Sequence, residues 1–171
     1  MKLFKTEEEK YGFKDDAGRT VIPAVYDFAL PFSGGLAAVC SGGRMGYGKT
    51  GFINENGDTV IDFIYDGARS FSEGLAQVEL KTGGVQKTGF IDHSGALVIP
   101  MNYNYAMSFR NGLAPVCIGE SWVGGKFGCI DKTGREVIPV IYDYLEPLET
   151  PGHFKVKSGG SWSEIALTTQ A

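Results

Sequence analysis

Short apolar runs alternate with glycine-rich polar stretches along this chain, and the whole pattern returns at a fixed interval. The glycine that precedes the first apolar run of each unit recurs after 39, 38 and 39 residues, at Gly12, Gly51, Gly89 and Gly128. Self-similarity at such a period is typical of repeat architectures, in which each unit buries its apolar face against its neighbours. The sequence therefore predicts four tandem repeats.

The apolar runs within a unit have the length and spacing of short β-strands. In the second unit a first strand at 51–53 is followed by the turn Asn54 to Gly57, where asparagine bonds to the backbone and glycine takes a left-handed conformation. A second strand begins at the Val-Ile pair, and a third alternates over 75–78. The stretch from the Tyr-Asp pair to the following phenylalanine is about six residues, too short for a stable helix, so a single helical turn or irregular corner is expected there.

The third strand leads through a glycine-rich loop into the first strand of the next unit. This connection predicts a hairpin that crosses each repeat boundary, with residues 3–5 and 165–167 as opening and closing strands. We expect one all-β repeat domain that forms an open, twisted, β-solenoid-like stack with about three strands per repeat. A four-bladed propeller is the alternative, because four units of this length would suit it. The domain is predicted over 1–171, with repeats near 11–49, 50–87, 88–126 and 127–157 and partial capping units at 1–10 and 158–171.

Charge and cysteine usage exclude several classes of partner and site. The net charge of −4 and the lack of a basic cluster argue against nucleic acid, and no apolar run is long enough to cross a membrane. The first residues lack the apolar stretch of a signal peptide. Three cysteines without CxxC spacing predict free thiols rather than disulfides or zinc, which favours a reducing, cytoplasmic location.

One segment matches the phosphate-loop pattern GxxxxGK[ST], from Gly43 to Thr50. That loop requires a helix after it, so that the helix N-terminus meets the phosphate. Here a predicted strand and turn follow instead, and Lys49-Thr50-Gly51 recurs at 87–89 without a phosphate loop. We therefore predict no nucleotide site.

The remaining polar residues give no catalytic constellation. The acids that follow the tyrosine in three of the four units, Asp27, Asp66 and Asp143, are interpreted as braces of the corner. The tyrosine column is interpreted as core, with a ligand-stacking ladder as the alternative. His93 and His153 have no partners at metal or nucleophile spacing. The chain is therefore predicted to be no enzyme, with no catalytic residue, metal or cofactor.

The order Gly-aromatic-Ile-Asp-x-x-Gly, Val-Ile-Pro, Tyr-Asp and Phe-Ser-x-Gly-Leu-Ala-x-Val resembles the WG-repeat (KWG-repeat) family over residues 11–157. The tryptophan of the family's name is replaced by Tyr11, Thr50, Thr88 and Phe127, and only Trp162, which precedes serine, holds its column. The resemblance implies a mostly bacterial protein-interaction or ligand-binding module without a shared catalytic motif. Since some such arrays occur near toxin or secretion systems, it also implies an inhibitor or immunity role as one form of that function.

The loops that join the third strand of one unit to the first strand of the next unit differ in sequence from unit to unit. Equivalent loops of a regular array align on one edge, and large apolar or arginine side chains at loop tips are typical of interfaces. The alternative is that these side chains fold back over the adjacent hairpin. We predict a non-catalytic module that binds another protein, with a glycan or small-ligand binder as the alternative, and leave its oligomeric state open. The predicted partner-binding residues are Arg44, Met45, Tyr47, Val85, Trp122 and Val123.

Overall fold

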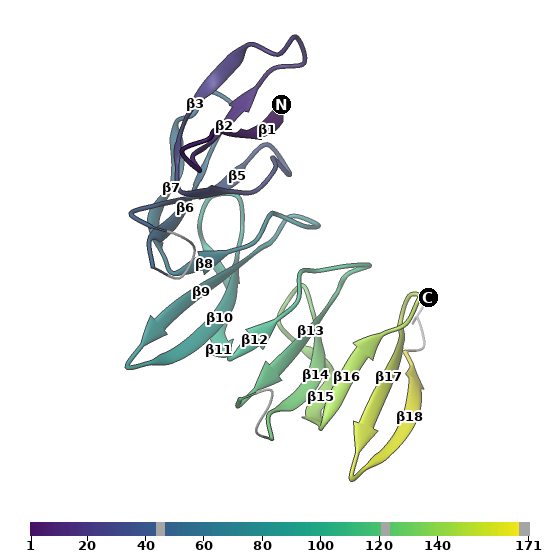
Figure 1. The fold of residues 1–171 in the computed structure, drawn as a ribbon. Helices are drawn as coiled ribbons and strands as arrows, with labels where there is room; N and C mark the ends of the chain where they lie inside the picture. Colours follow the sequence, from purple (N-terminus) through teal and green to yellow (C-terminus); the bar gives the residue numbers. More distant parts are fainter. Residues whose placement is uncertain (44–46, 121–123, 168–171) are drawn as a thin grey trace.

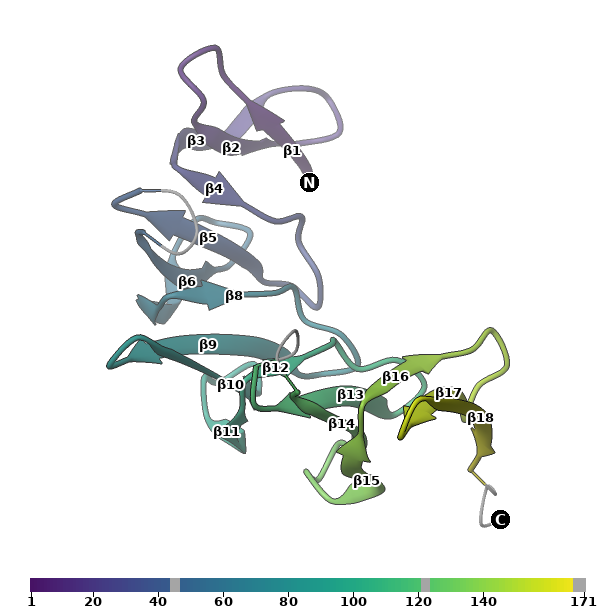
Figure 2. The same ribbon diagram turned by 60° about the horizontal axis from the view of Figure 1, so that its bottom comes forward.

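The protein is an open array of five small antiparallel β-sheets. The computed structural model describes residues 1–43, 47–120 and 124–167, and these residues contain strands and turns but no helix. Figures 1 and 2 show the sheets following one another along a curved, twisted path, with the N-terminus at one end and β18 in the last sheet at the other. The all-β open stack is confirmed, and the propeller alternative is wrong because the array does not close on itself.

We number the sheets along the chain. Sheet 1 contains β1 (Lys2–Lys5), β2 (Tyr11–Lys14) and β3 (Thr20–Tyr26). Sheet 2 contains β4 (Phe28–Ala29), β5 (Ala37–Ser41), β6 (Lys49–Ile53) and β7 (Thr59–Tyr65). Sheet 3 contains β8 (Gly67–Ala68), β9 (Ala76–Thr82), β10 (Val85–Ile91) and β11 (Leu97–Tyr103). Sheet 4 contains β12 (Tyr105–Ala106), β13 (Leu113–Ile118), β14 (Lys126–Asp131) and β15 (Glu136–Tyr142). Sheet 5 contains β16 (Tyr144–Pro147), β17 (His153–Ser158) and β18 (Ser161–Ala166).

Each inner sheet takes two strands from one sequence repeat and two from the next. The central hairpin of sheet 3, for example, pairs Val78 of β9 with Gly89 of β10. The predicted opening and closing strands are also present, since β1 pairs with β2 and β18 pairs with β17. The hairpin that crosses the repeat boundary is therefore confirmed.

The corner between the second and third strands differs from the expectation. Instead of a helical turn or irregular corner, the chain forms the two-residue strands β4, β8 and β12, so each inner sheet has four strands rather than three. Leu30 continues this contact by donating its N–H to the Ala38 carbonyl, 2.9 Å away. A strand of two residues is too short to show an alternating pattern, which is why the sequence did not reveal it.

The core lies between neighbouring sheets and is built from a repeated aromatic pair. Phe52 of sheet 2 and Phe71 of sheet 3 are buried with ring centroids 5.1 Å apart. The same contact joins sheets 1 and 2 through Phe13 and Phe32, and sheets 3 and 4 through Phe90 and Phe109. Because each sheet depends on its neighbours for burial, stability is shared along the array.

The tyrosine column belongs largely to this core. Tyr65 and Tyr103 are each 6% exposed, while Tyr26 and Tyr142 are half-buried. Tyr26 stacks on Phe63 with centroids 6.4 Å apart. The core interpretation is confirmed for the two inner tyrosines, which offer no rings for a ligand-stacking ladder.

Within the described residues, no helix has the length and apolar character to span a membrane.

Candidate functional site

The array has two long edges with different kinds of loop (Figure 1). One edge carries the loops that join β5 to β6, β9 to β10, β13 to β14 and β17 to β18, and we call it the hairpin edge. The opposite edge carries the turns that lead into β5, β9, β13 and β17, and we call it the turn edge. The predicted partner-binding residues belong to the hairpin edge.

Two of these residues can be placed in the structure. Tyr47 is 93% exposed beside β6, and Val85 is 50% exposed at the start of β10. The alternative that Tyr47 folds back over its hairpin is therefore wrong. Arg44, Met45, Trp122 and Val123 lie outside the described residues.

The recurring aspartates brace the corners, as predicted. Asp66 accepts a hydrogen bond at 2.8 Å from the Lys49 ammonium and another at 2.8 Å from the Lys81 N–H. Asp66, which follows β7, thus connects the start of β6 to β9. Lysine and aspartate 17 residues apart repeat the ion pair in the first and fourth units, at Lys10–Asp27 and Lys126–Asp143. In the third unit Asn104 takes the position of the acid, at hydrogen-bond distance from the Lys87 ammonium and the Gly119 N–H.

The same brace explains the phosphate-loop match. Lys49 is the repeat's lysine and is already paired with Asp66, while Thr50 is completely buried. Both residues lie in β6, a strand, where a phosphate loop would begin a helix. Lys49 and Thr50 thus hold the positions that the repeat gives them in a strand.

Replacing Asp66 by asparagine is expected to remove a pH-dependent part of the stability. The Lys49 ammonium, which donates to this carboxylate, holds the pKa of Asp66 below its ordinary value of about 3.9. A lowered folded-state pKa stabilises the protein above the unfolded pKa, and this contribution is lost as pH falls through the folded pKa. Urea titrations should show Asp66→Asn about 1 kcal/mol less stable than the wild type at pH 7.

The difference between Asp66→Asn and the wild type should shrink steadily as the pH is lowered below 4. The exposed Asp62→Asn on β7 is the matched control, because the Asp62 carboxylate makes no hydrogen bond or ion pair with the described residues. An equal loss for both variants at pH 7 would contradict the brace.

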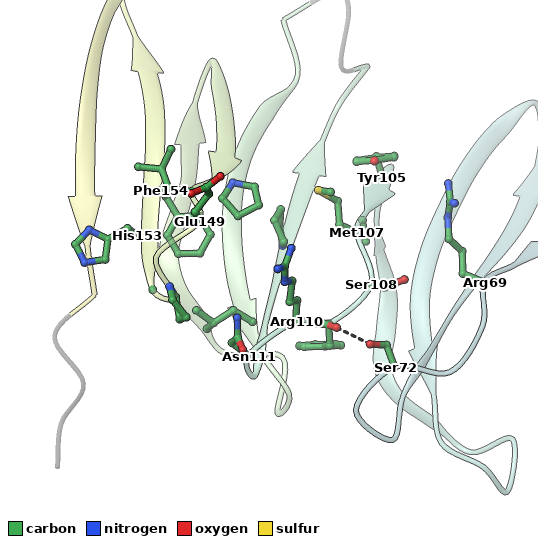
Figure 3. Close-up of a pocket in the computed structure, with 18 residues that line it drawn as sticks. Arg69, Ser72, Tyr105, Met107, Ser108, Arg110, Asn111, Glu149, His153 and Phe154 are labelled. Carbon is green, nitrogen blue, oxygen red and sulfur yellow. Dashed lines mark hydrogen bonds between the residues drawn. The ribbon is translucent and has the colours of Figure 1, made fainter. Parts of the chain in front are cut away.

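A groove opens on the turn edge where sheet 4 meets sheet 5 (Figure 3). It has a volume of about 910 Å³ and also reaches Arg69 and Ser72 of sheet 3. This volume lies in the range of protein ligand sites. The groove combines charged and apolar side chains, with Tyr105 and Met107 each about two-fifths exposed. Its charged or titratable lining residues are Arg69, Arg110, Glu149 and His153.

Three departures from the repeat coincide at this groove. The aromatic pair that joins the other sheets is replaced between sheets 4 and 5 by Cys129 and Leu148. The hydroxyls of Ser33 and Ser72 donate hydrogen bonds at 2.7 Å to the Phe71 and Phe109 carbonyls. In the third unit Arg110 stands at the equivalent position.

The third departure is the length of the turn into β17. Counted from the last core position, Phe109 or Leu148, to the positive-φ glycine that closes the turn, Gly112 or Gly152, it is one residue longer than in the third unit, and it contains Pro151. Smaller side chains, a missing hydrogen bond and a longer turn thus coincide at the junction where the groove opens.

Among the described residues that line the groove there is no cysteine. Burial raises the pKa of the Cys129 thiol to about 12, so this cysteine stays protonated at neutral pH. Burial also raises the pKa of Cys40 and Cys117, and all three thiols are free and buried. Among the described residues, no group of three or more His, Cys, Asp and Glu is placed to hold a metal ion.

A family model described as "WG containing repeat" matches residues 11–44, 51–81, 89–122 and 127–162. The chain belongs to the WG-repeat family. No curated protein matches this WG-repeat chain.

The structure shows which contacts are made at the positions for which the family is named. The WG glycine lies where the first strand bulges against the second, since a Cβ on Gly51 would lie 2.6 Å from the Ile61 carbonyl oxygen. Lys49, two residues before this glycine, makes the ion pair with Asp66. Trp162, which stands in the tryptophan column, is half-exposed on β18, with the Lys155 and Lys157 ammonium groups over its ring.

The groove of this WG-repeat protein was not predicted from sequence, because the predicted site residues all belong to the loops of the hairpin edge. The signals were nevertheless present in the repeat alignment. Arg110 stands in a column of serines, Leu148 in a column of phenylalanines, and Pro151 is an insertion. Only the contacts between sheets reveal that these changes fall at one junction.

Proposed function

We propose that this WG-repeat chain is a non-catalytic protein-binding module whose partner docks a peptide segment in the turn-edge groove. The observation that carries the proposal is the coincidence of an open sheet junction with exposed Tyr105 and Met107. Aromatic and methionine side chains are enriched at protein interfaces, and methionine adapts its shape to different partners. A groove between rigid sheets also holds these side chains in place before binding, which lowers the entropic cost.

The alternative of a glycan or small-ligand module has less support. It relied on the tyrosine column as a stacking surface, and the inner members of that column are buried. The hairpin edge, with Tyr47 and Val85 exposed, is a second protein-binding surface to compare with the groove.

The cellular form we propose is an inhibitor or immunity protein that binds a bacterial toxin or effector in the cytoplasm. The family resemblance supports the role, and the free state of the three cysteines supports the compartment.

A displayed library of random twelve-residue peptides, selected on the wild-type protein, tests the proposal. Enriched peptides are then titrated against Tyr105→Ala/Met107→Ala and against Tyr47→Ala/Val85→Ala. We expect the groove variant to weaken binding at least ten-fold and the hairpin-edge variant to leave it unchanged.

Loss of binding in the hairpin-edge variant alone would move the site to the other edge and refute the groove. Failure to enrich any peptide would refute peptide docking altogether. Circular dichroism of both variants establishes that the substituted side chains, which are partly exposed, do not disturb the fold.

A further inference from the structure

The groove carries positive charge without internal partners. Arg69 and Arg110 line it, and neither guanidinium group makes an ion pair or hydrogen bond with any other described residue. The other two described arginines, Arg19 and Arg135, are each bound to an aspartate of their own turn. The two groove arginines are thus the ones left available to a ligand.

The local charge opposes the charge of the whole chain. Two guanidinium groups face a single carboxylate, that of Glu149, whereas the chain carries a net charge of −4. In Figure 3, Arg69 and His153 stand toward opposite ends of the groove, with Arg110 between them and Glu149 on the sheet 5 side. Arginine binds carboxylates through paired, parallel hydrogen bonds, which favours an anionic ligand at this position.

A backbone acceptor is also free in the groove. At the two preceding junctions the carbonyls of Phe71 and Phe109 accept serine hydroxyls, and Figure 3 shows the Ser72 bond as a dashed line. The equivalent carbonyl, that of Leu148, receives no hydrogen bond from the described residues. A peptide can satisfy this acceptor with a backbone N–H, while a simple anion such as phosphate offers less for it to bind.

From these contacts we infer that the groove recognises an acidic, extended peptide segment in which carboxylates alternate with apolar side chains. The carboxylates pair with Arg110 and Arg69, the apolar side chains lie on Tyr105 and Met107, and one backbone N–H bonds to the Leu148 carbonyl. This inference rests on the proposed peptide-docking function and names the chemistry of its partner.

Two labelled ten-residue peptides test the inference by fluorescence polarisation on the full chain. One alternates Asp or Glu with Leu and Trp, and the other carries Asn or Gln at every acidic position. We expect the acidic peptide to bind at least ten-fold more tightly, with an advantage that falls as salt rises from 50 to 300 mM.

Arginine and glutamate variants assign the effect to individual side chains. Arg110→Gln should weaken the acidic peptide about ten-fold and leave the amide peptide unchanged. Arg110→Lys should lose less, because it keeps the charge but not the paired geometry. Glu149→Gln should strengthen the acidic peptide two- to three-fold. Arg135→Gln, at an exposed turn, is the control and should change neither affinity.

The possible failures separate the two proposals. If the amide peptide binds as tightly as the acidic one and both lose affinity in Tyr105→Ala/Met107→Ala, the groove is a docking site but the acidic preference is wrong. If the acidic peptide binds equally to the wild type and to Arg69→Gln/Arg110→Gln, its attraction is nonspecific and the inference fails. If neither peptide binds, the inference also fails, and the library selection decides the proposed function independently.

Discussion

Replacing Phe90 by alanine is expected to lower the free energy of unfolding by roughly 3–5 kcal/mol. Phe90 is completely buried and its ring lies 4.8 Å from that of Phe109, so it joins sheets 3 and 4 at the middle of the array. The loss combines reduced apolar burial with a cavity that rigid neighbours cannot fill. Urea denaturation followed by circular dichroism measures the change directly.

Leu97→Ala is the matched control for Phe90→Ala, because Leu97 lies in the same sheet with half of its side chain exposed. Its cost should stay within about 0.5 kcal/mol. If the two substitutions cost the same, the aromatic pair is not what holds adjacent sheets together.

The second large effect is expected for Gly89→Ala, which places a methyl group where backbone already stands. The added Cβ would lie 2.6 Å from the Ile99 carbonyl oxygen and 3.1 Å from the Met101 nitrogen. These atoms belong to β11 and can move only if the bulged pairing of β10 with β11 changes. The cost should reach the upper part of the roughly 1–3 kcal/mol typical of overpacking.

Thermal unfolding of Gly89→Ala and Gly67→Ala separates steric conflict from the general effect of adding a methyl group. A Cβ on Gly67 would meet the Glu79 carboxylate at 2.8 Å, but that group is the far end of a flexible side chain and can turn away. We therefore expect a clearly smaller fall in the melting temperature for Gly67→Ala. A larger fall for Gly67→Ala would show that backbone contact is not the reason for the glycine column.

Features that recur in every unit could be predicted from sequence, because four copies of one pattern reveal what each position requires. The hairpin turns, the burial of Tyr65 and the bracing role of Asp66 all belong to this class. The two-residue strands could not be predicted, since their partners lie in the following strand and leave no local period. The same alignment identified Lys49 as a repeat position, because Lys87 stands at the equivalent place in the next unit.

The groove is formed by residues that are far apart in the sequence and come together only in the folded array. Arg110 and Leu148 lie 38 residues apart in the chain, and their meeting follows from the stacking of sheet 4 against sheet 5. The sequence marked both as departures from their columns, but it gave no physical reason to consider them together. The exposure of Tyr47 was one of two alternatives that the sequence left open, and the structure decides between them.

The sharing of each sheet between two consecutive repeats bears on how such a protein can change length in evolution. A duplicated segment of one period supplies half a sheet to the unit before it and half to the unit after it, wherever the segment begins. The joined product again pairs its strands, as β9 pairs with β10 across a boundary. Gain or loss of a whole period thus preserves the strand pairing inside the array, and a later change at one junction, like that of Arg110, alters the surface there without altering that pairing.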